Sequence, residues 1–308
     1  MKLNQLRDVL AVADRGSLRA AARHLGLAQP ALTRSVNLLE RELGVTLFDR
    51  QAKGMQLTTM GEHFVRRARA IHSEIKRARE ELDQLRGDTR GSISVCMSSL
   101  PHIALLPYAM GPFRERFPHI HIDVIEGVFP MVESALRDGT VDCYVGPLRS
   151  QPEVEDLVVE RLFDVTRVIL GRRNHPLANA TSLRELVGAE WVTTSITRKA
   201  EDELAPLFAQ HDLPTPRIVM QAHSALTSIV SVAFSDLLTL LPVQWTEFSI
   251  TREALQKINL VAPLPVLPLC IVRRAGLPLT PAAEYFCDML RRAAGHLHPE
   301  QPRAASKR

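Results

Sequence analysis

The chain has 308 residues, of which 45% are hydrophobic and 23% are charged, so it can bury sizeable cores and its length predicts two or three domains. Its apolar stretches are short and its first residues lack an apolar leader, so we expect neither secretion nor a membrane span, but a cytoplasmic protein. The four cysteines are widely separated without a C-x-x-C pair, which favours reduced, buried thiols over a disulfide framework or a zinc site.

The positive charge is concentrated near the amino end. Residues 1–90 hold 17 Lys and Arg against 11 Asp and Glu, a net of +6, whereas residues 91–308 hold 21 against 23, a net of −2. A basic module joined to a nearly neutral body indicates a head that binds a polyanion. Charge alone does not separate DNA from RNA or anionic lipid.

Residues 1–44 predict a helix-turn-helix. Apolar residues recur at helical spacing up to Arg15, Ser17 caps a second helix that ends at Gly26, and Pro30 lies in the first turn of a third. The front of this third helix carries side chains suited to reading base edges in a major groove. The expected DNA-reading residues are Gln29, Pro30, Thr33, Arg34 and Asn37. A compact helical hairpin with a solvated polar face is the alternative.

Residues 45–61 predict a wing, because a short apolar run, a basic turn and a second extended piece follow one another. Arg50 and Lys53 in the turn are expected to contact backbone phosphates, which position a protein on DNA without reading its sequence. An ordinary solvated loop is the alternative.

The sequence from Gly16 to Gly61, GSLRAAARHLGLAQPALTRSVNLLERELGVTLFDRQAKGMQLTTMG, resembles the winged helix-turn-helix of LysR-type transcriptional regulators. Two positions depart from the family pattern: Ala28 replaces a usual Ser, and Lys53 replaces a common Arg. Loss of a Ser cap costs about 1 kcal/mol of helix stability, and Lys keeps the charge without bidentate geometry. We expect both changes to shift the preferred operator without removing DNA binding.

Residues 59–90 predict a linker and dimerisation helix. A capping box at Thr59–Glu62 opens a helix to about Arg86, followed by a polar hinge at residues 86–91. Its apolar residues follow the 3.5-residue period of a coiled-coil seam, and its opposite face is charged. The seam consists of Phe64, Ala68, Ile71, Ile75, Ala78, Leu82 and Leu85. Dimerisation would pair two heads on double-stranded DNA with a pseudo-palindromic operator. A single helix packed on a globular core is the alternative.

Residues 91–295 alternate predicted strands and helices, which indicates parallel sheets with helices on both faces, in two lobes. The expected strands are 92–97, 121–126 and 141–146, and then segments near 166–170, 191–194, 217–221, 237–241 and 267–274. The expected helices are 101–117 and 131–137, and then segments near 201–211, 225–234 and 280–294.

In such sheets a ligand binds outside the carboxyl ends of the strands, against helix amino ends. The expected effector-binding residues are Ser98, Ser99, Leu100, Phe129, Gly146, Pro147, Thr194, Ser195 and Thr197. Hydroxyls beside helix amino ends favour a small organic anion, and the apolar members of this set suit an aromatic one. For each hydroxyl, an ordinary helix cap without a ligand is the alternative.

Three further segments, FRERFPHIHIDVIEG, LRDGTVDCYVG and GRRNHPLA, resemble LysR-type effector domains, which are similar in fold to periplasmic substrate-binding proteins. The resemblance implies an α/β multidomain chain: a winged helix-turn-helix at 1–58, a linker helix and hinge at 59–90, and an effector domain at 91–295. Lobe 1 would hold about 91–164 and 267–295, and lobe 2 about 165–266. Residues 296–308 form a basic tail that we expect to be disordered. The resemblance also implies homotetramers, built as dimers of dimers, that contact RNA polymerase when activated.

No nucleotide-binding, metalloprotease or hydrolase motif is present, so we expect no enzyme activity, no cofactor and no metal. His119 and His121 alternate along one predicted strand, but no partner ligand lies at a diagnostic spacing. Two rival functions belong to other classes. A two-lobed solute-binding module for transport would need export, and an enzyme with a regulatory DNA-binding head would need turnover.

Overall fold

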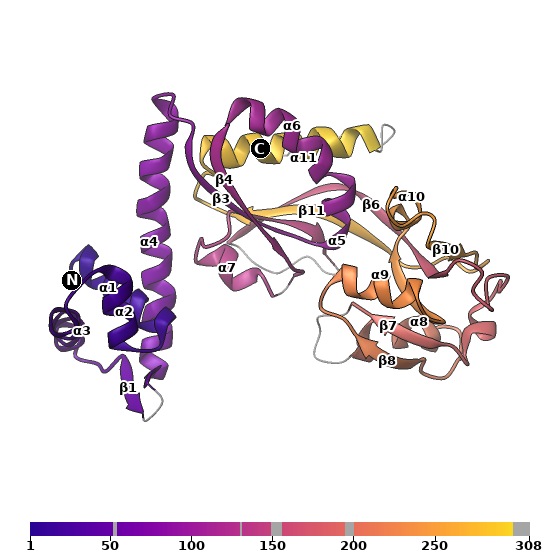
Figure 1. The fold of residues 1–308 in the computed structure, drawn as a ribbon, viewed down its shortest axis with the longest axis horizontal. Coiled ribbons are helices and arrows are strands. Elements are labelled where there is room, and N and C mark those ends of the chain that lie inside the picture. Colours follow the sequence, from indigo (N-terminus) through magenta and orange to yellow (C-terminus); the bar gives the residue numbers. More distant parts are fainter. Residues whose placement is uncertain (52–53, 130, 149–155, 195–199, 298–308) are drawn as a thin grey trace. The chain divides into compact units, whose positions relative to one another are not determined.

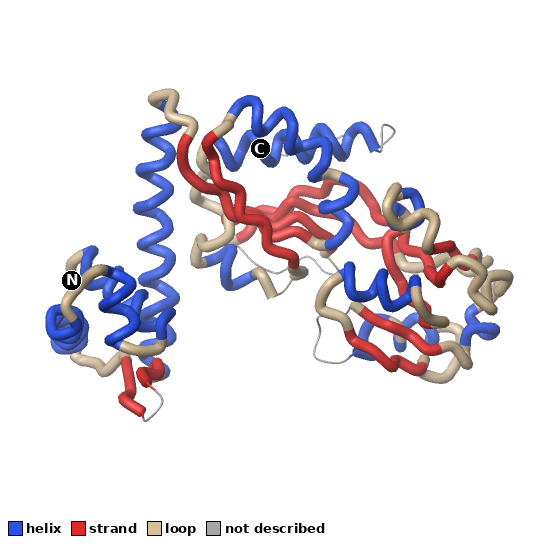
Figure 2. The backbone as a smooth tube through the Cα atoms, viewed as in Figure 1, coloured by secondary structure: helices blue, strands red, loops and turns tan. Residues whose placement is uncertain are grey.

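The computed structural model describes residues 1–51, 54–129, 131–148, 156–194 and 200–297. The chain divides into two compact units, Met1–Asp88 with Ser134–Val141 and Thr89–Glu133 with Asp142–Arg308. Helices dominate the first unit, and an extended sheet runs through the second (Figures 1 and 2). No helix of the described residues is long and apolar enough to cross a lipid bilayer.

The first unit is a helical head with a two-stranded wing. Its elements within Met1–Asp88 are α1 (Leu3–Arg15), α2 (Leu18–Leu25), α3 (Gln29–Leu43), β1 (Phe48–Gln51), β2 (Gly54–Leu57) and α4 (Thr59–Leu85). β1 and β2 pair antiparallel to form the wing. The apolar faces of α1, α3 and the first turns of α4 meet in one core, which includes Val9, Leu32, Leu39 and Val65. The sequence periodicity predicted these helices because each has one apolar face.

The start of α4 differs from the expected capping box at Thr59–Glu62. The N-cap is Thr58, whose Oγ1 accepts a hydrogen bond from the Gly61 N–H at 2.9 Å. The same hydroxyl donates to the carbonyl oxygen of Thr46 at 2.7 Å, which ties the helix start to the segment just before β1. The expectation was therefore wrong by one residue, because a tertiary contact selects between two adjacent threonines.

The rest of the chain alternates strands and helices. In chain order these are β3 (Arg90–Met97), α5 (Ser99–Ala104), α6 (Leu106–Arg116), β4 (His119–Glu126), α7 (Glu133–Arg137), β5 (Cys143–Pro147), β6 (Leu157–Arg172), η1 (Leu183–Leu186), β7 (Glu190–Thr193), η2 (Ala200–Glu203), α8 (Ala205–Ala209), β8 (Arg217–Gln221), α9 (Ala225–Ala233), β9 (Leu237–Pro242), α10 (Gln244–Glu247), β10 (Leu255–Ile258), β11 (Val266–Arg274) and α11 (Pro281–Leu297).

Nine strands of the described residues form one sheet, in the order β4-β3-β5-β11-β6-β9-β7-β8, with β10 paired to β6. The β3–β4, β3–β5, β7–β8 and β7–β9 pairs are parallel, whereas every pair that involves β6 or β11 is antiparallel. The expectation of parallel sheets was therefore wrong at the centre of the sheet, where β6 and β11 pair antiparallel. Short helical crossovers enforce parallel pairing only between consecutive units, and β6 and β11 are not joined in this way.

The long strand β6 defines two lobes. It pairs with β11 up to Thr166 and with β9 from Arg167 onward, and β11 begins at Val266. We call lobe 1 the part built on β3, β4, β5, β11 and the first half of β6, with α5, α6 and α11. Lobe 2 is the part built on β7 to β10 and the second half of β6, with α8 to α10. The chain thus passes between lobes within a continuous strand.

Several element boundaries differ from those expected. The helix predicted at 101–117 is two helices, because Pro107 in the first turn of α6 cannot donate a backbone hydrogen bond. Similarly, the helix predicted at 201–211 is split into η2 and α8, with Pro206 in the first turn of α8. β6 begins at Leu157 rather than near Thr166. Charged residues in its first half interrupt the apolar pattern by which a strand is predicted. One of these, Glu160, is paired with Arg291 at 2.9 Å.

Each lobe has its own core. In lobe 1, α6 and α11 pack on the sheet, and Phe113 meets Phe286 edge-to-face with ring centroids 5.2 Å apart. The sheet of lobe 2 is covered on both faces. Trp191 belongs to one core cluster and its neighbour Val192 to the other, since successive residues of a strand point to opposite faces.

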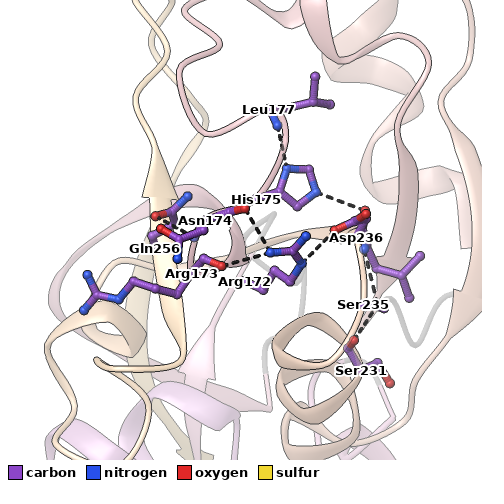
Figure 3. Close-up of polar contacts among 10 residues, drawn as sticks. Arg172, Arg173, Asn174, His175, Leu177, Ser231, Ser235, Asp236 and Gln256 are labelled. Atoms are coloured by element: carbon purple, nitrogen blue, oxygen red, sulfur yellow. Dashed lines mark hydrogen bonds and ion pairs between the residues drawn. The ribbon is translucent and has the colours of Figure 1, made fainter.

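The GRRNHPLA segment covers the end of β6 and the turn that follows it, and its side chains contact Asp236, the residue before β9 (Figure 3). Arg172 Nε donates to Asp236 Oδ1 at 2.7 Å, and the Leu177 N–H donates to His175 Nδ1 at 3.0 Å. His175 Nε2 therefore carries the proton and donates to the Asp236 carbonyl oxygen at 3.0 Å. These hydrogen bonds lie within lobe 2 and connect the end of β6 to the residue before β9.

Candidate functional site

The predicted DNA-reading side chains of α3 lie together on one face of the head. They line a single surface hollow whose described members are Gln29, Pro30, Thr33, Arg34, Asn37, Leu38 and Arg41. Leu38 and Arg41 were not predicted, although they continue the same face by one further turn. The sequence signal was present in the helical spacing, since Arg41 follows Asn37 by four residues.

The opposite face of α3 holds it in the head. Leu32, Val36 and Leu39 are buried in the core. Ser35 Oγ donates to Asp8 Oδ2 at 2.6 Å, and the buried Asp8 joins α1 to α3. The Thr33 hydroxyl donates to the carbonyl oxygen of Gln29 at 3.0 Å, so its position on the outer face is fixed by the helix itself. The face is therefore presented by a rigid element.

The wing is tied to the end of α3. Glu40 Oε1 accepts hydrogen bonds from the Leu47 N–H at 2.7 Å and from the Phe48 N–H at 3.2 Å. The residues predicted to contact phosphates are Arg50 and Lys53. The backbone of Arg50 belongs to β1, but its side chain and all of Lys53 lie outside the described residues.

The predicted seam of α4 divides into two parts. Ala68 is buried and Phe64 packs against the head core, so these two side chains are covered by their own chain. Farther along the helix the apolar side chains become exposed: Ile71 is 40%, Leu82 is 57% and Leu85 is 69% exposed. Exposed apolar side chains at this spacing suit a second helix.

A cavity of about 290 Å³ lies between the two lobes. The predicted effector residues that line it are Ser98, Ser99, Leu100, Phe129, Pro147 and Thr194. Gly146 is not among its lining residues, and Ser195 and Thr197 lie outside the described part of the chain. Most of the remaining apolar wall comes from β6, β9 and β11, which meet here because β6 is shared by both lobes.

The position of Gly146 has a different explanation. The buried ring of Tyr144 covers Gly146. The Tyr144 hydroxyl donates a hydrogen bond to the Pro147 carbonyl oxygen at 3.3 Å, and the ring centroid lies 6.1 Å from that of Phe129. Burial raises the pKa of Tyr144 well above its ordinary value. Tyr144 therefore supports the cavity wall as a neutral phenol.

Sequence reasoning missed the charged groups of the cavity. The buried Arg167 on β6 forms an ion pair with Glu203 of η2 and donates to the Leu240 carbonyl oxygen at 2.8 Å. Glu126, at the end of β4, contacts Ser224 and Ala225 at the start of α9. No local pattern identifies these residues, because their partners are distant in the sequence.

Comparison with known proteins agrees with this architecture. Residues 3–62 match the family described as the bacterial regulatory helix-turn-helix protein, lysR family, and residues 86–295 match the LysR substrate binding domain. The transcriptional regulator GalR of Pseudomonas putida is 28% identical over 86% of this chain and 67% of its own length. The regulator TdcA of Escherichia coli is 28% identical over 75% of this chain and 74% of its own.

Solved structures share the fold. The full-length regulator CbnR in complex with its target DNA has a TM-score of 0.68 and 22% identity, covering 95% of this chain and 100% of its own. A full-length OxyR variant from Pseudomonas aeruginosa has a TM-score of 0.69 and 23% identity, covering 94% and 98%. These families and relatives are transcriptional regulators rather than enzymes. The chain therefore belongs to the LysR family of DNA-binding transcriptional regulators.

Proposed function

We propose that this regulator reads a specific double-stranded operator with α3, under the control of a small molecule bound between lobes 1 and 2. The observation that supports the first part most directly is the single exposed face of α3. It gathers an amide, a guanidinium and a hydroxyl on a helix anchored from behind by buried Leu32, Val36 and Leu39. Arg34 is suited to guanine, and Gln29 and Asn37 to adenine.

The Arg34→Ala variant tests this proposal. Duplexes bound by the protein are first selected from genomic fragments, and affinity is then measured by fluorescence anisotropy at fixed salt. We expect a loss of about 10- to 100-fold on the selected duplex, with a smaller change on random DNA, because the side chain would contact a base edge. The matched control is Arg184→Ala, an exposed arginine of lobe 2. Unchanged affinity and sequence preference in Arg34→Ala would remove Arg34 from the DNA-reading face.

The effector proposed for the cavity is a small organic anion with an aromatic or other apolar body. Apolar side chains such as Leu100, Phe129 and Pro147 form much of the wall. The guanidinium of Arg167, the Ser98 hydroxyl and the amino end of α9 supply groups that bind anions. Control requires that the effector bind one arrangement of the protein more tightly than another.

The proposed assembly is a homo-oligomer, with two chains joined along the exposed part of α4 and two such dimers forming a tetramer. The side chains proposed to form this dimer contact are Ile71, Ile75, Ala78, Leu82 and Leu85. A two-fold axis would set two heads on half-sites of a pseudo-palindromic operator, with Arg50 and Lys53 of each wing on phosphates. Contact with RNA polymerase on activation and a cytoplasmic location complete the proposal.

A further inference from the structure

The carboxylate of Glu126 links lobe 1 to lobe 2 at the cavity. Glu126 ends β4 in lobe 1, and α9 of lobe 2 begins at Ala225 with Ser224 as its N-cap. Glu126 Oε1 accepts from the Ala225 N–H at 3.0 Å, and Oε2 accepts from Ser224 Oγ at 3.2 Å. The Ser224 hydroxyl in turn accepts from the Leu226 N–H at 3.2 Å. Both carboxylate oxygens therefore lie at a helix amino end of the opposite lobe.

This arrangement is the one by which helix amino ends bind anions, with N–H donors and the positive end of the helix dipole directed at negative charge. Here the protein supplies the anion from its own chain. Glu126, Ser224 and Ala225 line the cavity, whereas Leu226 does not. A ligand carboxylate can bind the same Ala225 N–H only after Glu126 has left it.

A second observation points to a ligand in the same cavity. Ser98 is 4% exposed, and its Oγ has no hydrogen-bond partner among the described residues. Burying a hydroxyl without a partner is unfavourable, and a polar group of a ligand would satisfy it. Ser98 lines the cavity from lobe 1, while Ser224 and Ala225 line it from lobe 2.

The charges of the cavity decide which carboxylate is exchanged. Among the described residues, the carboxylates that line the cavity are those of Glu126 and Glu203, and the guanidinium that lines it is that of Arg167. Glu203 is buried with Arg167, so its departure would leave a buried, uncompensated cation, at a large cost in free energy. Glu126 is exposed and can turn into water at a much smaller cost.

We infer that Glu126 is an internal competitor that sets the specificity of the cavity for an apolar monocarboxylate, whose carboxylate replaces that of Glu126 at Ser224 and Ala225. The inference rests on the proposed function of the cavity as the effector site. Because the Glu126 contact joins the two lobes, its exchange for a ligand carboxylate changes how the lobes are held. The effector thereby acquires the differential interaction that control requires.

The first measurement needs no ligand. Hydrogen exchange, followed by mass spectrometry on the full-length protein, compares wild type with Glu126→Ala and with Glu115→Ala, an exposed carboxylate of α6 in the same lobe. We expect peptides containing the Ala225 amide to exchange faster only in Glu126→Ala. Equal exchange in all three proteins would contradict the link.

The second measurement uses benzoate as the probe and benzamide as its uncharged counterpart of similar shape, by calorimetry. We expect Glu126→Ala to bind benzoate about tenfold more tightly than wild type, because the Ala225 N–H and Ser224 hydroxyl no longer contact Glu126. Glu126→Gln keeps an acceptor without the charge and should give an intermediate gain. The affinity for benzamide should change little. Equal benzoate affinities, no benzoate binding by Glu126→Ala, or an equal gain for benzamide would each overturn the inference.

The design separates this inference from the proposed function. Circular dichroism and operator affinity confirm that each variant is folded. If the cavity is not the effector site, Glu126→Ala still gains affinity for benzoate, but benzoate leaves operator affinity unchanged in every variant. If Glu126 is not a competitor, wild type and Glu126→Ala bind benzoate alike, whatever their affinity for DNA.

Discussion

The ring of Tyr144 lies directly against the α-carbon of Gly146, two residues farther along β5. A β-carbon at Gly146 would lie 2.1 Å from the Tyr144 Oη and 2.3 Å from its Cζ, which is too close for any side chain. Phe129, a cavity residue, rests against this ring. Gly146 thus acts on the cavity indirectly, by leaving room for the aromatic ring behind its wall.

Gly146→Ala should lower the free energy of unfolding by about 1–3 kcal/mol, because the buried Tyr144 ring has to move. Urea unfolding followed by circular dichroism measures this change. Gly111→Ala in α6 is the matched control, since nothing lies within 4 Å of its added β-carbon and alanine favours helix. A Gly146→Ala protein as stable as Gly111→Ala would show that the ring adjusts freely.

Gly61→Ala should destabilise the head and weaken DNA binding. Gly61 lies in the first turn of α4, and its added β-carbon would be 2.0 Å from the carbonyl oxygen of Leu47, a backbone atom that cannot rotate away. We expect a loss of about 1–3 kcal/mol in head stability. Thermal unfolding and operator anisotropy report it, with Gly295→Ala in α11, where the space is open, as the control. Wild-type values for both quantities would argue against this close packing.

Introducing Asp at both Ile75 and Leu82 should yield monomers in sedimentation velocity, since charge in an apolar seam is strongly unfavourable. Operator affinity should fall as well, because two linked heads bind together more tightly than one. Ser73→Asp places a similar charge on the opposite face of α4 and should leave the oligomer intact. Intact oligomers of the Ile75/Leu82 variant would move the dimer contact elsewhere.

The thiols of Cys96 and Cys270 should make stability fall at alkaline pH. Burial raises the pKa of each thiol from 9.0 to about 11. Between pH 9 and 11 the unfolded chain loses these protons while the folded chain keeps them, so the free energy of unfolding decreases as pH rises through this window. Urea unfolding across the window measures the slope, which should be shallower in the Cys96→Ala/Cys270→Ala variant. Identical slopes would mean that other groups determine the alkaline loss.

Much of the head could be predicted from the sequence, because its information is local. The apolar stripe of α3 leaves the opposite face to Gln29, Arg34 and Asn37, and the structure places these side chains in one hollow. Helical periodicity is set by residues three and four apart, and the interactions that select it act over the same distance. The boundary error at Thr58 arose where a contact with Thr46, twelve residues away, entered.

The effector body was less predictable, because its decisive contacts join distant segments. Arg167 meets Glu203 across 36 positions, and Glu126 meets Ala225 across 99. Neither pair leaves a trace in local composition. The sequence also does not predict the antiparallel pairing of β6 with β11, since an alternating or apolar strand pattern does not encode the direction of the neighbouring strand.

The sequence by itself determined the approximate positions of most helices and strands, the face of α3 that carries the proposed DNA-reading side chains, and the LysR resemblance. Those properties follow from side-chain periodicity and local caps. Only the tertiary structure decided that Gly146 makes room for Tyr144, that Ala68 is covered by its own head, and that Glu126 lies at the start of α9. Burial and electrostatic partnership depend on which segments the folded chain brings together, and chain order alone does not specify that.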